Sequence, residues 1–140
     1  MKRITAIALF TIASFVTAGS AWAQDHDVRA TVPFDFTVGD KLLPPGTYEI
    51  TTAMSGVIEI QNRSKHVAIL TTTSPDSNKS RISKLVFDKY GNQYFLSEIL
   101  CPSANMNVSV PPSKHEKQAA SSEPCSRTAA RSSLQLSSRD

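Results

Sequence analysis

The sequence contains few of the residues that carry catalytic or metal chemistry. Its 140 residues include three histidines, two cysteines and one tryptophan. The histidines (His26, His66 and His115) are scattered, no H-E-x-x-H or Cys/His cluster has the spacing of zinc ligands, and no G-x-S-x-G motif is present. We therefore expect no catalytic residue, no metal site and no cofactor, and we predict that the protein is not an enzyme.

Beyond its first residues the chain also lacks any long hydrophobic run. Met1-Lys2-Arg3 is followed by about 15 uncharged residues, and the segment ends in the small-residue pattern Ala21-Trp22-Ala23. This layout is typical of a secretory signal peptide, and the run is shorter than the roughly 20 residues that a spanning helix needs. We expect residues 1–23 to be cleaved after Ala23, which gives a secreted or periplasmic protein with no stable membrane insertion.

The chain has little excess of charge of either sign. The formal net charge is +3 at pH 7, and two of the positive charges, Lys2 and Arg3, belong to the expected leader. A processed chain this close to neutrality does not favour binding to nucleic acid. Its length suits a single domain.

Alternation of apolar and polar residues with a period of two recurs from residue 28 to residue 101 and predicts strands. The expected fold is all-β, a small antiparallel sandwich or partly open barrel of about six to seven strands. Gly91-Asn92 suits the two-residue turn of a hairpin, which sets Phe87 opposite Leu96. The predicted core consists of inward-facing residues of these strands: Val32, Phe34, Phe36, Val38, Tyr48, Ile50, Ile58, Ile60, Leu85, Phe87, Phe95 and Leu96.

The strand pattern fades after Cys101, and we divide the processed chain there. Residues 24–101 are expected to form the β domain, and residues 102–120 a short extended segment followed by one short helix. Ser113-Lys114-His115-Glu116 has the S-x-x-E form of a capping box, which marks the start of a helix. Residues 121–140 are rich in serine and poor in large apolar residues, so they are predicted to be a disordered tail.

The two cysteines, Cys101 and Cys125, lie in the part of the chain that we expect to be exported. In an oxidising compartment they could form one disulfide. The alternative is two free thiols, because Cys125 lies in the segment predicted to be disordered. The sequence leaves both alternatives open.

Two blocks of the chain resemble a family of small secreted bacterial proteins with no assigned activity. The first block is VPFDFTVGDK (residues 32–41) with LPPGTY (residues 43–48), and the second is KLVFDKYGNQYFL (residues 84–96). Residues 112–117 are similar to that family's closing helix, and this chain has Pro45 where the family usually has alanine. The resemblance covers residues 28–120 and implies export and a compact β domain. It implies no catalytic residue.

Three functional hypotheses follow. We favour a non-enzymatic secreted or envelope protein that serves as a partner-binding module, with an unknown protein or glycan of the cell envelope as its partner. The alternative is a carrier of a small apolar ligand, in which aromatic residues such as Phe34, Tyr48 and Tyr94 line a β-barrel cavity and not the core. The third is a hydrolase, whose paired carboxylates would be Glu49 and Glu59, on the polar faces of their predicted strands.

Overall fold

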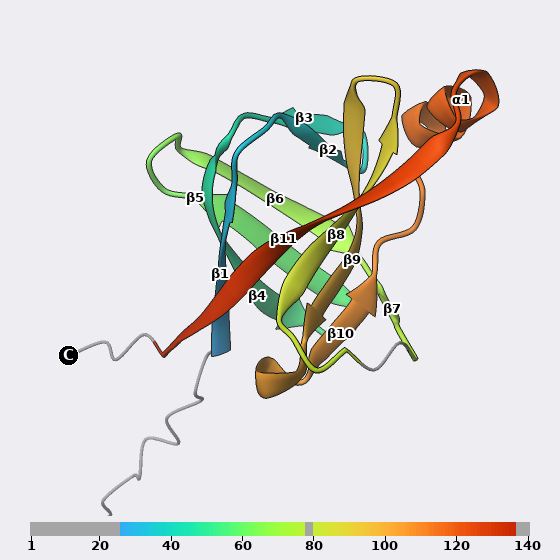
Figure 1. Cartoon of the computed structure of the whole chain (residues 1–140). Helices are drawn as coiled ribbons and strands as arrows, with labels where there is room; N and C mark the ends of the chain where they lie inside the picture. Colours follow the sequence, from blue (N-terminus) through green and yellow to red (C-terminus); the bar gives the residue numbers. More distant parts are fainter. Residues whose placement is uncertain (1–25, 78–79, 137–140) are drawn as a thin grey trace, which may run out of the picture.

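The fold is all-β, as the alternation predicts. The computed structural model describes residues 26–77 and 80–136, and for His26 and residues 131–136 it describes the backbone alone. The described residues form eleven strands in a strongly curled open sheet with the order β3-β2-β9-β8-β11-β1-β4-β5-β6, to which β10 and β7 are added beside β9 (Figure 1). One helix, α1, packs outside the curl near the β8–β9 hairpin (Figure 1).

The elements follow one another in a simple order, and their bounds are these. The strands are β1 (His26–Val32), β2 (Phe36–Val38), β3 (Lys41–Leu43), β4 (Gly46–Met54), β5 (Val57–Asn62), β6 (Val67–Thr72), β7 (Ser74–Pro75), β8 (Lys84–Tyr90), β9 (Gln93–Cys101), β10 (Met106–Ser109) and β11 (Cys125–Leu136). A short 3-10 turn, η1 (Pro102–Ala104), precedes β10, and α1 (Lys114–Ser122) precedes β11.

A single predicted strand over residues 28–38 is divided in the structure. β1 ends at Val32, and β2 begins at Phe36 and pairs with β3 and β9 in place of β4. Pro33 lies at the break, where its missing N–H prevents it from continuing a hydrogen-bonded ladder. The division moves the chain from one half of the curled sheet to the other.

The β8–β9 hairpin has the predicted register. Tyr90 pairs with Gln93, and Phe87 pairs with Leu96. A register shift follows, so that Val86 lies opposite Glu98. We expected Ile99 on the outer face by simple alternation, but the extra residue turns it inward, and Ile99 is fully buried in the core cluster.

The curl of the sheet encloses one hydrophobic core. The structure buries eleven of the twelve predicted core residues, and Phe34, in the link between β1 and β2, is half-buried against them. Phe95 is also buried but lies outside the main cluster, with its ring against Tyr90. Aromatic rings fill one end of the core: Phe36 contacts both Tyr48 and Phe87 edge to face, with ring centroids 5.1 Å and 5.4 Å away.

The structure differs most from the sequence prediction at the C-terminal segment, residues 121–140. Residues Cys125–Leu136, within the segment predicted to be a disordered tail, form β11, which pairs antiparallel with β8 on one side and with β1 on the other. Residues 137–140 lie outside the described residues. The prediction counted only side-chain burial, whereas a strand between two others also satisfies its backbone groups on both sides. The β domain is therefore not confined to residues 24–101, because β10 and β11 belong to its sheet.

The docking of β11 can be tested with two neighbouring alanines. Ala130 packs against the core, whereas Ala129 is exposed on the outer face. We predict that Ala130→Asn lowers the free energy of unfolding by about 1–3 kcal/mol, because it buries an amide without a partner. Ala129→Asn should change it by no more than about 0.5 kcal/mol. Urea denaturation followed by circular dichroism measures both, and equal effects would contradict the inward orientation of Ala130.

Candidate functional site

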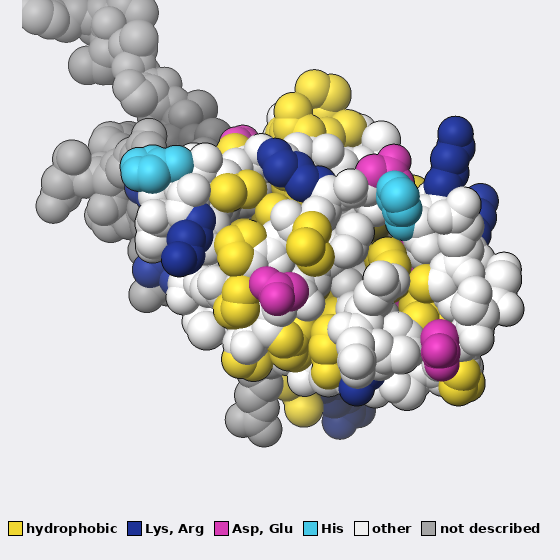
Figure 2. Space-filling view, turned by 90° about the horizontal axis from the view of Figure 1, so that it is seen from above, with side chains coloured by type: hydrophobic (Ala, Val, Ile, Leu, Met, Phe, Trp, Pro, Cys, Tyr) yellow, Lys and Arg dark blue, Asp and Glu magenta, His cyan; other side chains and the backbone are white. Residues whose placement is uncertain are grey.

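A groove of about 880 Å³ lies on the outer surface between α1, the β8–β9 turn and the β2–β3 pair. Figure 2 looks down on this end of the molecule and shows hydrophobic side chains interspersed with acidic, histidine and other polar groups. Eleven of the fifteen lining residues have a polar group in the side chain. The lining consists of Asp35, Thr37, Asp40, Leu42, Tyr90, Gly91, Asn92, Gln93, Tyr94, Phe95, His115, Gln118, Ala119, Ser122 and Glu123.

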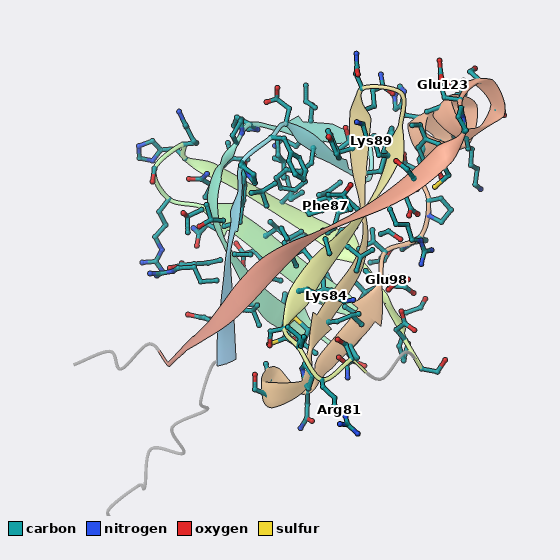
Figure 3. All side chains as sticks on the ribbon, in the orientation of Figure 1. Arg81, Lys84, Phe87, Lys89, Glu98 and Glu123 are labelled. Carbon is teal, nitrogen blue, oxygen red and sulfur yellow. The ribbon has the colours of Figure 1, made fainter. Side chains whose placement is uncertain are left out.

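Two glycine turns form the rim of the groove. Gly39, in the turn between β2 and β3, has φ +61°, and Gly91, in the hairpin turn, has φ +58°. Both values lie in the left-handed region, where other residues are strained. A Cβ built on Gly91 would lie 3.5 Å from Cγ of Glu123, so the end of the helix leans against the hairpin turn (Figure 3).

The helix that forms one wall starts at the predicted capping box. The Oγ of Ser113 accepts a hydrogen bond from the backbone N–H of Glu116 at 3.2 Å, and the backbone N–H of Ser113 bonds to the Glu116 carboxylate. Pro111 and Pro112 precede this cap and bring the chain from β10 to the helix. The helix therefore begins at a fixed place on the outer face of the sheet.

Aromatic side chains form the floor of the groove. Phe95 is 3 % exposed, and its ring centroid lies 5.8 Å from that of Tyr90. Tyr94 stacks on Phe34 at 4.1 Å, and the Lys89 ammonium lies 5.2 Å from the centre of the Tyr94 ring. These contacts hold the rings in place and leave their polar ends at the groove.

A cluster of charged groups lies beside this floor, on the outer face of β8, β9 and β11. Arg127 pairs with Asp88 in the β11–β8 register. Its Nε donates to Asp88 Oδ1 at 3.1 Å, and its Nη1 donates to Glu98 Oε1 at 3.2 Å. Glu98 lies on β9 (Figure 3). One guanidinium therefore joins three strands and compensates two largely buried carboxylates.

Glu116 adds a third carboxylate to this cluster from the helix, and it is 7 % exposed. Burial, together with the nearby charge of Asp88, raises the pKa of Glu116, and the bond from the Ser113 backbone partly offsets this rise. Burial and contact with Cys125 raise the pKa of Tyr90 to about 12, so its hydroxyl stays protonated at neutral pH. The Asp88 carboxylate raises the pKa of Arg127. This cluster fixes α1 to the sheet beside the groove.

The three histidines do not come together. His66 is exposed in the turn between β5 and β6, His115 lines the groove, and the side chain of His26 lies outside the described residues. Glu49 does not form a carboxylate pair with Glu59, because it lies against Arg29 and Arg63, the latter at 2.8 Å. Within residues 26–77 and 80–136 no group of three or more His, Cys, Asp or Glu residues could hold a metal ion.

The structure leaves both cysteines free and places them far apart. Cys125 pairs with Tyr90 at the hairpin end of β8 and is exposed. Cys101 is buried at the opposite end of β9, where its Sγ lies 3.3 Å from Oγ of Ser83. Most of the length of the hairpin separates them, which is more than the roughly 7 Å limit between bonded Cα atoms. An intramolecular disulfide is therefore incompatible with this fold.

No protein-family model, curated protein or solved structure matches the chain. Within the described part of the chain, no helix combines the length and apolar character that crossing a bilayer requires. The groove thus has to be interpreted from its own geometry.

Sequence reasoning did not identify the groove as a site. Its lining comes from four separate segments, and only tertiary packing of α1 on the sheet brings them together. Two local signals were present: the capping box at Ser113 and the hairpin turn at Gly91 mark the two ends that meet. Neither signal indicates that Asp35 and Asp40 lie opposite them.

Glu116 provides a pH-dependent test of the helix contact. Its pKa in the folded protein is raised above the ordinary value of 4.5. Its stabilising contribution is therefore complete below that value and is lost as pH rises through the folded pKa. We predict that Glu116→Gln, which keeps the capping geometry, melts at a higher temperature than the wild type at pH 7. The difference should disappear below pH 4.5.

Thermal denaturation from pH 4 to pH 8 measures this effect. Glu123→Gln, at the exposed end of the same helix, is the control and should change stability by no more than about 0.5 kcal/mol. A Glu116→Gln variant that melts below the wild type at pH 7 would show that the carboxylate stabilises the fold in its charged form.

Proposed function

We propose that the protein is a non-enzymatic secreted or envelope binding module, and that the groove beside α1 binds a neutral glycan. The observation that carries this proposal is the chemistry of the lining. Carboxylate, amide, hydroxyl and imidazole groups surround an aromatic floor, and the lining contains no lysine or arginine.

These groups match the hydrogen-bonding needs of sugar hydroxyls. Each hydroxyl both donates and accepts. The carboxylates of Asp35 and Asp40 would accept hydrogen bonds, and the amides of Gln93 and Gln118 would do both. A few convergent polar groups around an apolar floor are typical of small-molecule sites.

The charges of the lining disfavour an anionic ligand. Asp35, Asp40 and Glu123 are exposed carboxylates at the groove, and His115 is the one lining residue that can become cationic near neutral pH. A phosphate or a uronic acid would approach like charges without a guanidinium or ammonium in the lining to pair with. A neutral polysaccharide meets no such repulsion.

The interior of the sheet favours core over cavity for the aromatic residues. Phe34 contacts Phe87 edge to face at 5.1 Å and stacks on Tyr94, and Phe36 contacts Phe87 and Tyr48. Rings that pack on one another support a structural role. We therefore place binding on the outer surface and set aside the carrier of an apolar ligand.

Affinity electrophoresis of the processed chain (residues 24–140) tests the proposal. The gels contain xylan, dextran or hydroxyethylcellulose as neutral polysaccharides, and alginate as the anionic comparison. We predict retardation in at least one neutral gel, unchanged between 50 mM and about 500 mM salt because no charge on the ligand is screened. Retardation in alginate alone, or in no gel, would contradict the proposal.

Two variants assign the binding to the groove. Asp40→Ala and Gln118→Ala each remove an exposed polar group from the lining, and each should weaken binding about tenfold, as the loss of a charged or well-placed hydrogen bond does. Thr52→Ala, exposed on β4 and outside the lining, is the matched control and should bind like the wild type. Equal binding by all three would place the glycan elsewhere.

A further inference from the structure

The curled sheet ends in two strands, β3 and β6, and these two edges differ. Among the described strands β3 pairs only with β2 and β6 only with β5. β3 has three residues and begins with Lys41, whereas β6 has six residues, VAILTT, without a charge. Short length and edge lysines are devices that prevent strand addition, and β6 has neither.

The register fixes which backbone groups of β6 face outward. The N–H of Thr73 donates to the carbonyl of Gly56 at 2.8 Å, and these residues continue the β5–β6 register. Hydrogen-bonded pairs alternate in an antiparallel ladder. Val67, Ile69 and Thr71 therefore bond to β5, and Ala68, Leu70 and Thr72 direct their N–H and C=O groups to the free edge.

The side chains on this edge are uncharged and apolar at the centre. Leu70 is 66 % exposed on the outer face, with Ala68 and Thr72 exposed on either side of it. Ile69, on the inner face, packs partly against the core. An added strand would cover the flank of both residues.

We propose that β6 pairs antiparallel with β6 of a second copy of this chain, about a two-fold axis at Leu70. In this register Leu70 lies opposite Leu70 of the partner subunit, and Ala68 lies opposite Thr72 of the partner subunit. All three outward-facing residues of each strand then form hydrogen-bonded pairs, which gives about six bonds across the axis. Inner residues meet inner residues, so the sheet continues with its core face on one side.

Charge selects this antiparallel arrangement and a second copy as the occupant. Arg63 and Lys65 lie in the turn before β6, and the strand itself carries no charge. Antiparallel pairing places the two basic turns at opposite ends, about 30 Å apart at roughly 3.4 Å per residue. Parallel pairing would set them side by side. An isologous contact of this kind closes as a dimer and does not propagate.

Analytical ultracentrifugation of the processed chain tests the oligomeric state. The wild type should approach twice the monomer mass as its concentration rises, and Leu70→Lys should stay monomeric with an unchanged circular dichroism spectrum. Met54→Lys is the matched control, because Met54 is 63 % exposed but lies on β4, away from the edge. A monomeric wild type, or a dimer that Leu70→Lys leaves intact, would overturn the proposal.

Cysteine cross-linking tests the register. In a Cys125→Ser background, which removes the exposed thiol, mild oxidation should link Leu70→Cys chains to one another, because paired Cα atoms lie about 5.5 Å apart. Ala68→Cys chains should not link to themselves, but should link to Thr72→Cys chains when the two are mixed. Self-linking of Ala68→Cys chains in preference to Leu70→Cys chains would overturn the register.

Discussion

The structure depends on the pairing of β11 with two strands at once. β11 bonds to β8 along one side and to β1 along the other, and these pairings join the half of the sheet that ends in β6 to the half that ends in β3. Without β11, β1 and β8 would each become an additional open edge. A segment with small and polar side chains thus determines whether the sheet is continuous, because its backbone is paired on both sides.

The same pairing positions the groove. α1 lies between β10, which is bonded to β9, and β11, which is bonded to β8. Both ends of the helix are consequently tied to adjacent strands, and the helix crosses their outer face. Arg127 on β11 reinforces the arrangement through Asp88 and Glu98. The charged cluster is best understood as the fixing of one wall of the groove, since its groups are buried and paired.

The sequence predicts what is local and misses what is not. Alternation along β4 and β5, the register of the β8–β9 hairpin and the capping box at Ser113 each depend on residues close together in the chain, and all are present in the structure. The inward turn of Ile99 and the strand β11 depend on partners far away. Composition cannot show that Ala130 and Thr128 need only small side chains, because β8 and β1 already flank them.

A sheet that curls without closing divides its surfaces by role. Its inner face is filled by rings and aliphatic side chains, so it has no need of a ligand to complete it. Its outer face carries the groove, whose polar lining is accessible at the surface and held by the helix. Its two edges are unequal, because β3 is short and starts with a charge while β6 is long and uncharged. A dimer through β6 lies two-fold symmetric at the edge opposite β3, in the strand order, and leaves the groove of each copy open. Pairing two open grooves on one assembly would increase the avidity for a repeating polymer without any new contact to a single sugar unit.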